Sequence, residues 1–182
     1  MAAGIELPFI FARGDERRAA GTGDIQLEFR RMISKGERFE QAAGVQVIAP
    51  SATDELLEDG QTQLGLAWGL SSEVGKRTTL DVEFHYRKAV SSKFGTPKLH
   101  SVGVEAILTR AFTQRVAAYL DSDNYYEFSV HGYVNLLKAG VQVLLDRQKK
   151  WGLSPYVLFP STQAARQVET RGAAGLDLTF EF

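Results

Sequence analysis

Histidine side chains are the groups with which this chain could most readily catalyse a reaction, and it has three of them, His85, His100 and His131. His131 follows Ser129 by two positions, so the two side chains would share a face of a strand, as a nucleophile and its base require. A catalytic pair also needs a third group that orients the base, and the sequence identifies none. We therefore predict a solvated pair in a loop, no catalytic residue and no enzyme.

Metal and nucleotide chemistry is not indicated either. No two histidines stand at the spacing of metal ligands. The chain has no cysteine, which excludes a disulfide scaffold and a thiol nucleophile. The segment GTGD at 21–24 reads as a turn before a strand, because no helix follows it to bind a phosphate. The sequence predicts no metal and no cofactor.

Ionisable residues alternate with apolar ones, and this alternation predicts the elements that carry them. Between Leu80 and Arg87, apolar and ionisable residues exchange at every position. A strand places successive side chains on opposite faces, whereas a helix would scatter both sets around its circumference. The same period recurs at 5–11, 24–30, 44–49, 63–70, 102–109, 115–121, 141–146, 153–159 and 175–182. We expect about ten strands of about ten residues each, the length that a tilted strand needs to cross a bilayer.

Composition narrows the class of protein further. The 182 residues carry 21 Lys and Arg against 22 Asp and Glu, a balance that argues against a nucleic-acid partner. The mean hydropathy is -0.17, and no apolar run approaches the length of a membrane-spanning helix. Spanning strands are compatible with both facts. We expect one domain over 1–182.

Three features favour an apolar face that meets lipid over one that faces a soluble core. The polar face is rich in small residues, which suit a crowded interior: Gly65, Ala67, Gly69, Gly103, Ala173 and Gly175. Aromatic residues recur near strand ends, like an interfacial girdle: Phe11, Trp68, Tyr86, Trp151, Phe159 and Phe182. The chain ends in GLDLTFEF, which is similar to the terminal strand that the barrel-assembly machinery reads in outer-membrane proteins.

The connections between the strands alternate in length. Long polar segments are expected around 14–22, 50–60, 90–98, 122–132 and 160–171, and short turns around 34–38, 72–77, 112–114 and 147–150. Long outer loops and short periplasmic turns are typical of outer-membrane barrels. The stretch Asp123–Lys138 is open to interpretation as strand or loop. The sequence predicts an all-β, antiparallel, up-and-down transmembrane barrel in the bacterial outer membrane, without a signal peptide at its start.

Several segments resemble a family of bacterial outer-membrane transporter-like proteins assigned to the MetA pathway of phenol degradation. They are ELPF at 6–9, GTGDIQLEFRRMI at 21–33, GVQVIAP at 44–50, GQTQLGLAWGLS at 60–71 and AGVQVLLDRQKKWGLSPYVLFP at 139–160. The sequence departs from the family at 50–53, which reads PSAT where Pro-Thr-Gly-Asp is usual. Members also carry strands before the ELP segment, so twelve strands are possible. The resemblance implies a barrel that passes small, often aromatic, compounds and brings no catalytic residues.

The register assigns each side chain to one of two faces. The predicted lumen, a permeation path or a bracing network, contains Glu28, Arg30, Asp81, Glu83, His85, Arg87, Glu105, Arg115, Asp146 and Asp177, and also Glu6, Asp24, Glu40, Asp121, Lys138 and Glu181. The predicted membrane-facing residues are Leu64, Leu66, Trp68, Val82, Phe84, Val104, Val141, Val143, Leu176, Leu178, Phe180 and Phe182. An acid-rich lumen favours cations, although ion pairs that brace a narrow barrel explain the same residues.

The expected partners are the lipid bilayer, lipopolysaccharide, the barrel-assembly machinery and an unidentified small solute. The basic doublet Arg17-Arg18 lies in a predicted outer loop, where it would be solvated or contact lipopolysaccharide phosphates. The preferred function is passive passage or binding of small molecules. The alternative is a closed structural or interaction barrel whose long loops recognise a partner, with an outer-membrane hydrolase as a third possibility.

Overall fold

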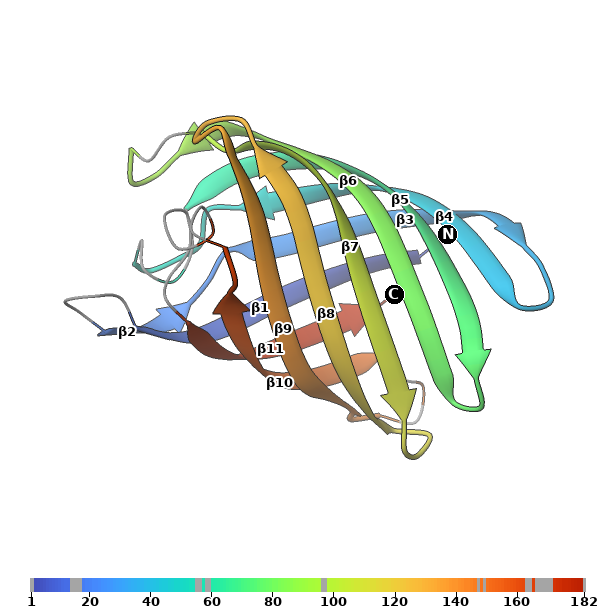
Figure 1. The fold of residues 1–182 in the computed structure, drawn as a ribbon. Coiled ribbons are helices and arrows are strands. Elements are labelled where there is room, and N and C mark those ends of the chain that lie inside the picture. Colours follow the sequence, from blue (N-terminus) through green and yellow to red (C-terminus); the bar gives the residue numbers. More distant parts are fainter. Residues whose placement is uncertain are drawn as a thin grey trace.

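The computed structural model describes residues 2–13, 18–54, 57, 60–95, 98–146, 148, 150–162, 165 and 172–181. Its strands are β1 Ala2–Arg13, β2 Arg18–Thr22, β3 Ile25–Lys35, β4 Phe39–Ala49, β5 Gln61–Gly75, β6 Thr78–Ser92, β7 His100–Ala111, β8 Val116–Glu127, β9 Gly132–Leu144, β10 Trp151–Pro160 and β11 Ala173–Glu181. They form one sheet, which the antiparallel pairing of β11 with β1 closes into a barrel (Figure 1). Within these ranges no helix is long and apolar enough to cross a membrane.

β2 and β3 occupy one position in the barrel wall. β2 pairs with the end of β1, where Phe9 lies opposite Thr22, and β3 pairs with its beginning, where Ala2 lies opposite Arg30. Gly23 and Asp24 interrupt the ladder between them. The barrel therefore has ten antiparallel positions, and the predicted fold class is confirmed.

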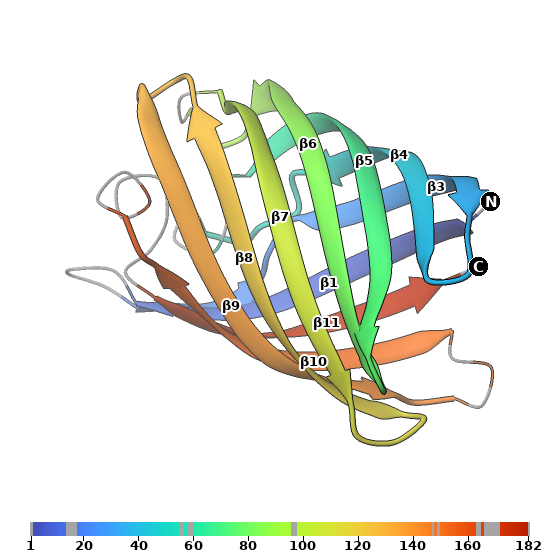
Figure 2. The same cartoon turned by 45° about the vertical axis from the view of Figure 1, so that its right-hand side comes forward.

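Both termini lie at the end of the barrel with the short turns, and the longer connections lie at the other end (Figures 1 and 2). We call these the turn end and the loop end. The turn between β5 and β6 consists of Lys76 and Arg77, and Arg77 has a φ of 61°. The connections at 50–60, 93–99 and 161–172 agree with the predicted long loops, whereas those at 14–17 and 128–131 have four residues each, no more than the turn at 112–115.

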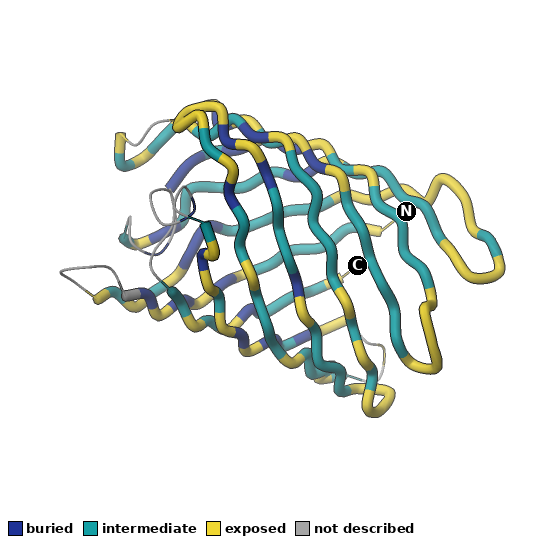
Figure 3. The backbone as a smooth tube through the Cα atoms, viewed as in Figure 1, coloured by how far each residue is buried: buried dark blue, intermediate teal, exposed yellow. Residues whose placement is uncertain are grey.

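The apolar side of each strand faces outward, and Figure 3 shows the resulting alternation of exposed and covered residues along the tube. On β6, Phe84 is 50% exposed, whereas the next residue, His85, is 4% exposed. The predicted membrane-facing side chains that are exposed are Leu64, Leu66, Trp68, Phe84, Val141 and Leu176. Those that are half-buried at outward positions are Val82, Val104, Val143, Leu178 and Phe180, while Phe182 lies outside the described residues.

Three boundaries predicted from the sequence are wrong. Residues 18–22 form β2 and not a loop, and β8 continues to Glu127, so the turn to β9 spans only 128–131. Backbone pairing continues through Ser122, Asp123 and Asn124 because the ladder does not depend on side-chain polarity. Trp68 lies in the middle of β5 and not near its end, because that strand extends to Gly75.

Candidate functional site

The interior of the barrel gathers the ionisable side chains, and their ion pairs reach past one or two intervening strands. Arg30 on β3 contacts Glu83 on β6 at 2.7 Å, although β4 and β5 separate the two strands. Only side chains that point into the barrel can meet in this way. The predicted lumen residues at inward positions are Glu28, Arg30, Asp81, Glu83, His85, Arg87, Glu105 and Asp177, together with Glu6, Glu40, Asp121 and Lys138. Glu181 also has an inward position in the register of β11, but it is exposed at the turn end. Asp24 is buried at the β2–β3 break, where its Oδ1 accepts a hydrogen bond from the backbone of Ala52.

Two predicted lumen residues, Arg115 and Asp146, lie in turns instead. β8 begins only at Val116, so Arg115 is exposed in the preceding turn. β9 ends at Leu144, and the Asp146 carboxylate accepts hydrogen bonds from the backbone nitrogens of Trp151 at 2.9 Å and Gln148 at 3.1 Å. The alternation continued past both strand ends in the sequence, which is why these two predictions are wrong.

The Asp146 turn gives a stability prediction that depends on pH. The hydrogen bond from the Trp151 backbone holds the pKa of the Asp146 carboxyl below its ordinary value of 3.8. A carboxyl with a lowered folded pKa stabilises the protein above the unfolded pKa, and this contribution is lost as the pH falls through the folded pKa. We expect Asp146→Ala to lower the urea midpoint of the refolded barrel at pH 7, and the difference from the original chain to shrink as the pH falls below 3.8. A Glu37→Ala variant, which removes an exposed carboxylate from another turn, controls for net charge; an equal loss in both variants would contradict this account.

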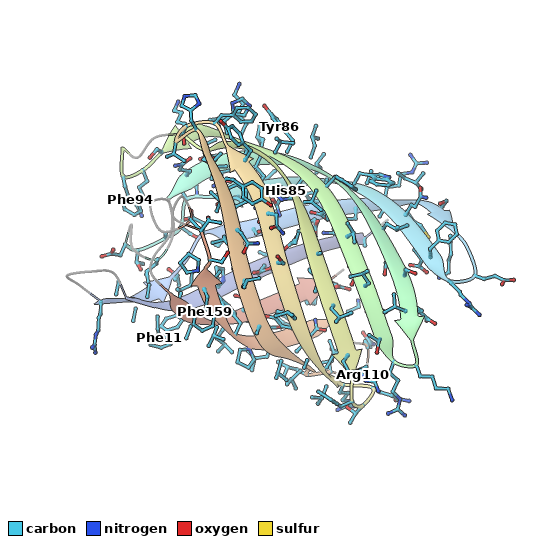
Figure 4. All side chains as sticks on the ribbon, in the orientation of Figure 1. Phe11, His85, Tyr86, Phe94, Arg110 and Phe159 are labelled. Atoms are coloured by element: carbon cyan, nitrogen blue, oxygen red, sulfur yellow. The ribbon has the colours of Figure 1, made fainter. Side chains whose placement is uncertain are left out.

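His85 is the centre of a buried cluster near the loop end. Its Nε2 lies 2.9 Å from Oδ1 of Asp123, and Nη1 of Arg87 lies 3.4 Å from Oδ2 of the same carboxylate. Gly103 lies between His85 and Tyr125 in the register, and the two rings stand 6.4 Å apart across it. His85 and the outward-facing Tyr86 are neighbours that point to opposite sides of β6 (Figure 4). The sequence prediction missed Asp123, although it continues the inward period of Tyr119 and Asp121.

A cavity of about 230 Å³ occupies the interior toward the turn end. Arg30 crosses it between two carboxylates, since it pairs with Glu28 as well as with Glu83. The acidic residues of the lining are Glu40, Asp81, Glu83 and Glu105. Glu83 and Glu105 lie directly opposite each other on β6 and β7. The charge of the cavity lining is therefore predominantly negative.

Lys138 links β9 to β11, the strand that closes the barrel by pairing with β1. Its Nζ lies 2.7 Å from Oδ2 of Asp177 and 4.0 Å from the centre of the Tyr156 ring. Tyrosines and glycines alternate across these strands in the order Tyr119, Gly140, Tyr156 and Gly175. A Cβ on Gly140 would lie 2.6 Å from the Tyr119 hydroxyl, so the missing side chain leaves room for the ring.

Two connections pack their apolar side chains into the mouth at the loop end. Leu57, from the β4–β5 connection, packs against Ile10 and Ala12 on the inner face of β1. Ala165, from the β10–β11 connection, is fully buried against Tyr125 and Val134. The loop end is therefore narrower than the strand wall alone would make it.

Ser129 and His131, the pair considered for catalysis, stay apart from this interior. Ser129 and His131 lie in the β8–β9 turn, where both are exposed. Among the described residues, no group of three or more His, Asp or Glu side chains is arranged to hold a metal ion.

Comparisons with known proteins identify the fold. No family model matches the chain, and no curated protein matches it. Among solved structures, it is similar to the NanC porin, with a TM-score of 0.62 and 9% identity over 98% of each chain. It is also similar to the KdgM porin, with a TM-score of 0.50 and 8% identity over 98% of this chain and 99% of that one. A membrane protein from work on in-meso crystallization has a TM-score of 0.53 and 9% identity, over 100% of this chain and 83% of that one. The chain thus folds as a closed, ten-stranded antiparallel β-barrel like those of small outer-membrane porins.

Proposed function

We propose that the barrel lies in the bacterial outer membrane and gives small polar solutes, cations above all, a narrow passive path. The outward apolar side chains support the location, as do aromatic contacts at both ends of the wall. At the loop end Tyr86 contacts His100, and at the turn end Trp151 packs on Phe180 with ring centres 4.5 Å apart. On the terminal strand, Leu176, Leu178 and Phe180 supply the outward pattern that the barrel-assembly machinery would read.

The charge of the inner face carries the preference for cations. Of the described strand residues, the cationic side chains at inward positions are Arg30, Arg87, Lys138 and, at the rim, Lys35. Each of them pairs with a carboxylate. Further acids, including Asp81 and Glu105, share the same interior, so negative charge is left over. Acidic rings favour cations in channels.

Reconstitution into planar bilayers tests this proposal. We expect a small conductance whose reversal potential in a salt gradient reports preference for the cation. The double variant Asp81→Asn/Glu105→Gln should lower the cation-to-anion permeability ratio by roughly two- to fivefold, since a charge about 4 Å away contributes about 1 kcal/mol in water. Glu37→Gln, in the exposed β3–β4 turn, is the control and should leave the ratio unchanged. An unaltered ratio in the double variant would contradict the cation path.

A narrower form of the proposal concerns small aromatic compounds. The sequence resemblance to the phenol-pathway family suggests such solutes, and Tyr119, an inward residue that is only half-buried, offers a ring on which they would stack. Current measured with and without added phenol tests it, because a solute that occupies the path reduces the ion current. Equal currents at every phenol concentration would contradict the aromatic solute but not the cation path.

The packing of Leu57 and Ala165 in the mouth favours a second candidate, a closed barrel whose loops bind a partner. An eight-stranded barrel is filled by its own side chains, and open aqueous channels belong to barrels of about sixteen strands. The same bilayer recording separates the candidates. If the refolded barrel passes no current, the pore is excluded and the closed barrel remains as the candidate.

A further inference from the structure

The outer wall has a hollow near the loop end, where β2, β1, β11 and β10 lie side by side. Its volume is about 620 Å³, and its lining includes Phe11, Arg18, Ala20, Val157, Phe159 and Ala174. It lies outside the barrel, so it is separate from the interior cavity. Figure 4 shows Phe11 and Phe159 on this part of the wall.

The register explains why the wall is hollowed at this place. Phe11 lies opposite Ala20 on one side and Ala174 on the other, and Ala174 in turn lies opposite Val157. The alanines give a shallow floor because their side chains end at Cβ. Phe11 and Phe159 stand beside that floor and are 55% and 56% exposed. A slender apolar chain would cover these rings and fill the space above the alanines.

Arg18 adds a positive charge at the end of the hollow nearest the loops. It is the charged residue among the described lining residues, and its side chain is exposed at the start of β2. An occupant that suits the site has an apolar chain along the alanine floor and an anionic group at the level of Arg18. A guanidinium binds phosphate oxygens through two parallel hydrogen bonds.

We propose that this hollow binds one phosphorylated, acylated lipid of the outer leaflet, with an acyl chain between Phe11 and Phe159 and a headgroup phosphate on Arg18. The proposal rests on the membrane location given under Proposed function, but not on passage of any solute. Arg18 lies nearer the loops than the two aromatic rings do. The phosphate and the acyl chain of such a lipid follow one another in the same order.

Retention of lipid A by the detergent-refolded barrel tests this inference. Native mass spectrometry counts the lipid molecules retained by each barrel, and the midpoint of heat-modified gel migration reports stabilisation by a ligand that binds the folded state. We expect one bisphosphorylated lipid A to be retained and to raise the midpoint. The dephosphorylated lipid should be retained far less.

Variants of the hollow and of the opposite wall make the test specific. Arg18→Ala should weaken lipid A binding by about tenfold, the effect of one charge-assisted contact, and Arg18→Lys should restore part of it. Ala174→Trp should abolish retention because it fills the floor. Lys88→Ala removes an exposed cation from β6 and serves as the control. Equal binding by Arg18→Ala and Lys88→Ala, or by both forms of the lipid, would overturn the site.

Failure of this site and failure of the pore give different results. A barrel that conducts but retains no lipid A contradicts the site alone. A barrel that retains the lipid through Arg18 but passes no current keeps the site and removes the pore. Heat-modified migration of each variant without lipid shows that the barrel has folded before either comparison is made.

Discussion

Leu66→Arg is expected to lower the free energy of unfolding of the barrel in bilayers by about 2–4 kcal/mol, the cost of a cationic side chain near the bilayer midplane. Leu66 lies near the middle of β5 and is 60% exposed on the outer wall. Arginine there must hold its charge in hydrocarbon or bend toward the headgroups. Urea titration of the refolded protein, followed by tryptophan fluorescence, measures the change.

Ser71→Arg is the matched control on the same strand. Ser71 faces the interior cavity and lies opposite Glu40 and Asp81. An arginine at this position meets carboxylates instead of lipid, so we expect a far smaller loss of stability. Equal losses at Leu66 and Ser71 would show that the two faces of β5 do not differ in environment.

Gly103→Ala should destabilise the barrel by about 1–3 kcal/mol through overpacking. A Cβ at this position would lie 2.5 Å from Cβ of Tyr125, 2.6 Å from the backbone oxygen of Asn124 and 2.8 Å from Cε1 of His85. The backbone oxygen belongs to the neighbouring strand and can move only with the ladder. The added methyl group therefore also disturbs the contact between His85 and Asp123.

Gly69→Ala tests whether the Gly103 effect comes from crowding and not from the loss of a glycine. The nearest atom to a Cβ on Gly69 is the Val82 backbone oxygen at 3.6 Å, an ordinary contact. Alanine also restricts the unfolded chain, which favours the folded state by about 0.4–1 kcal/mol where the site has room. The same urea titration should show Gly69→Ala neutral or slightly stabilising. A loss of stability as large as that of Gly103→Ala would show that both losses come from replacing a glycine and not from crowding.

The period of two in the sequence was enough to predict the fold class and the facing of most strands. It works because a one-residue shift would turn every apolar side chain of a strand to the other face. At 122–124 the sequence no longer alternates between apolar and polar residues, since Ser122 and Asn124 are polar although they point outward. The structure shows why they are tolerated: Asn135 Nδ2 donates hydrogen bonds to Ser122 Oγ and Asn124 Oδ1. This break concealed Asp123, the carboxylate partner of His85 and Arg87.

Strand ends and connections are the parts that the sequence left undetermined. At Arg115 and Asp146 the alternation runs on into turns, so hydrophobicity alone could not locate the ends of the strands. Leu57 and Ala165 follow no period at all, and their contacts with Ile10 and Val134 join segments far apart in the chain. Such contacts depend on the closed wall, which brings these segments together.

The pairing of β1 with β11 places Gly4 directly opposite Glu181. A few added residues would therefore bridge the first and last strands, and new termini could be opened between Lys76 and Arg77. Such a circular permutant would keep every inter-strand ladder, but its polypeptide would start with β6 and end with β5. The junction of β1 and β11 thus differs from the other strand junctions only in lacking a connecting turn. The hydrogen-bonded wall continues through it without interruption.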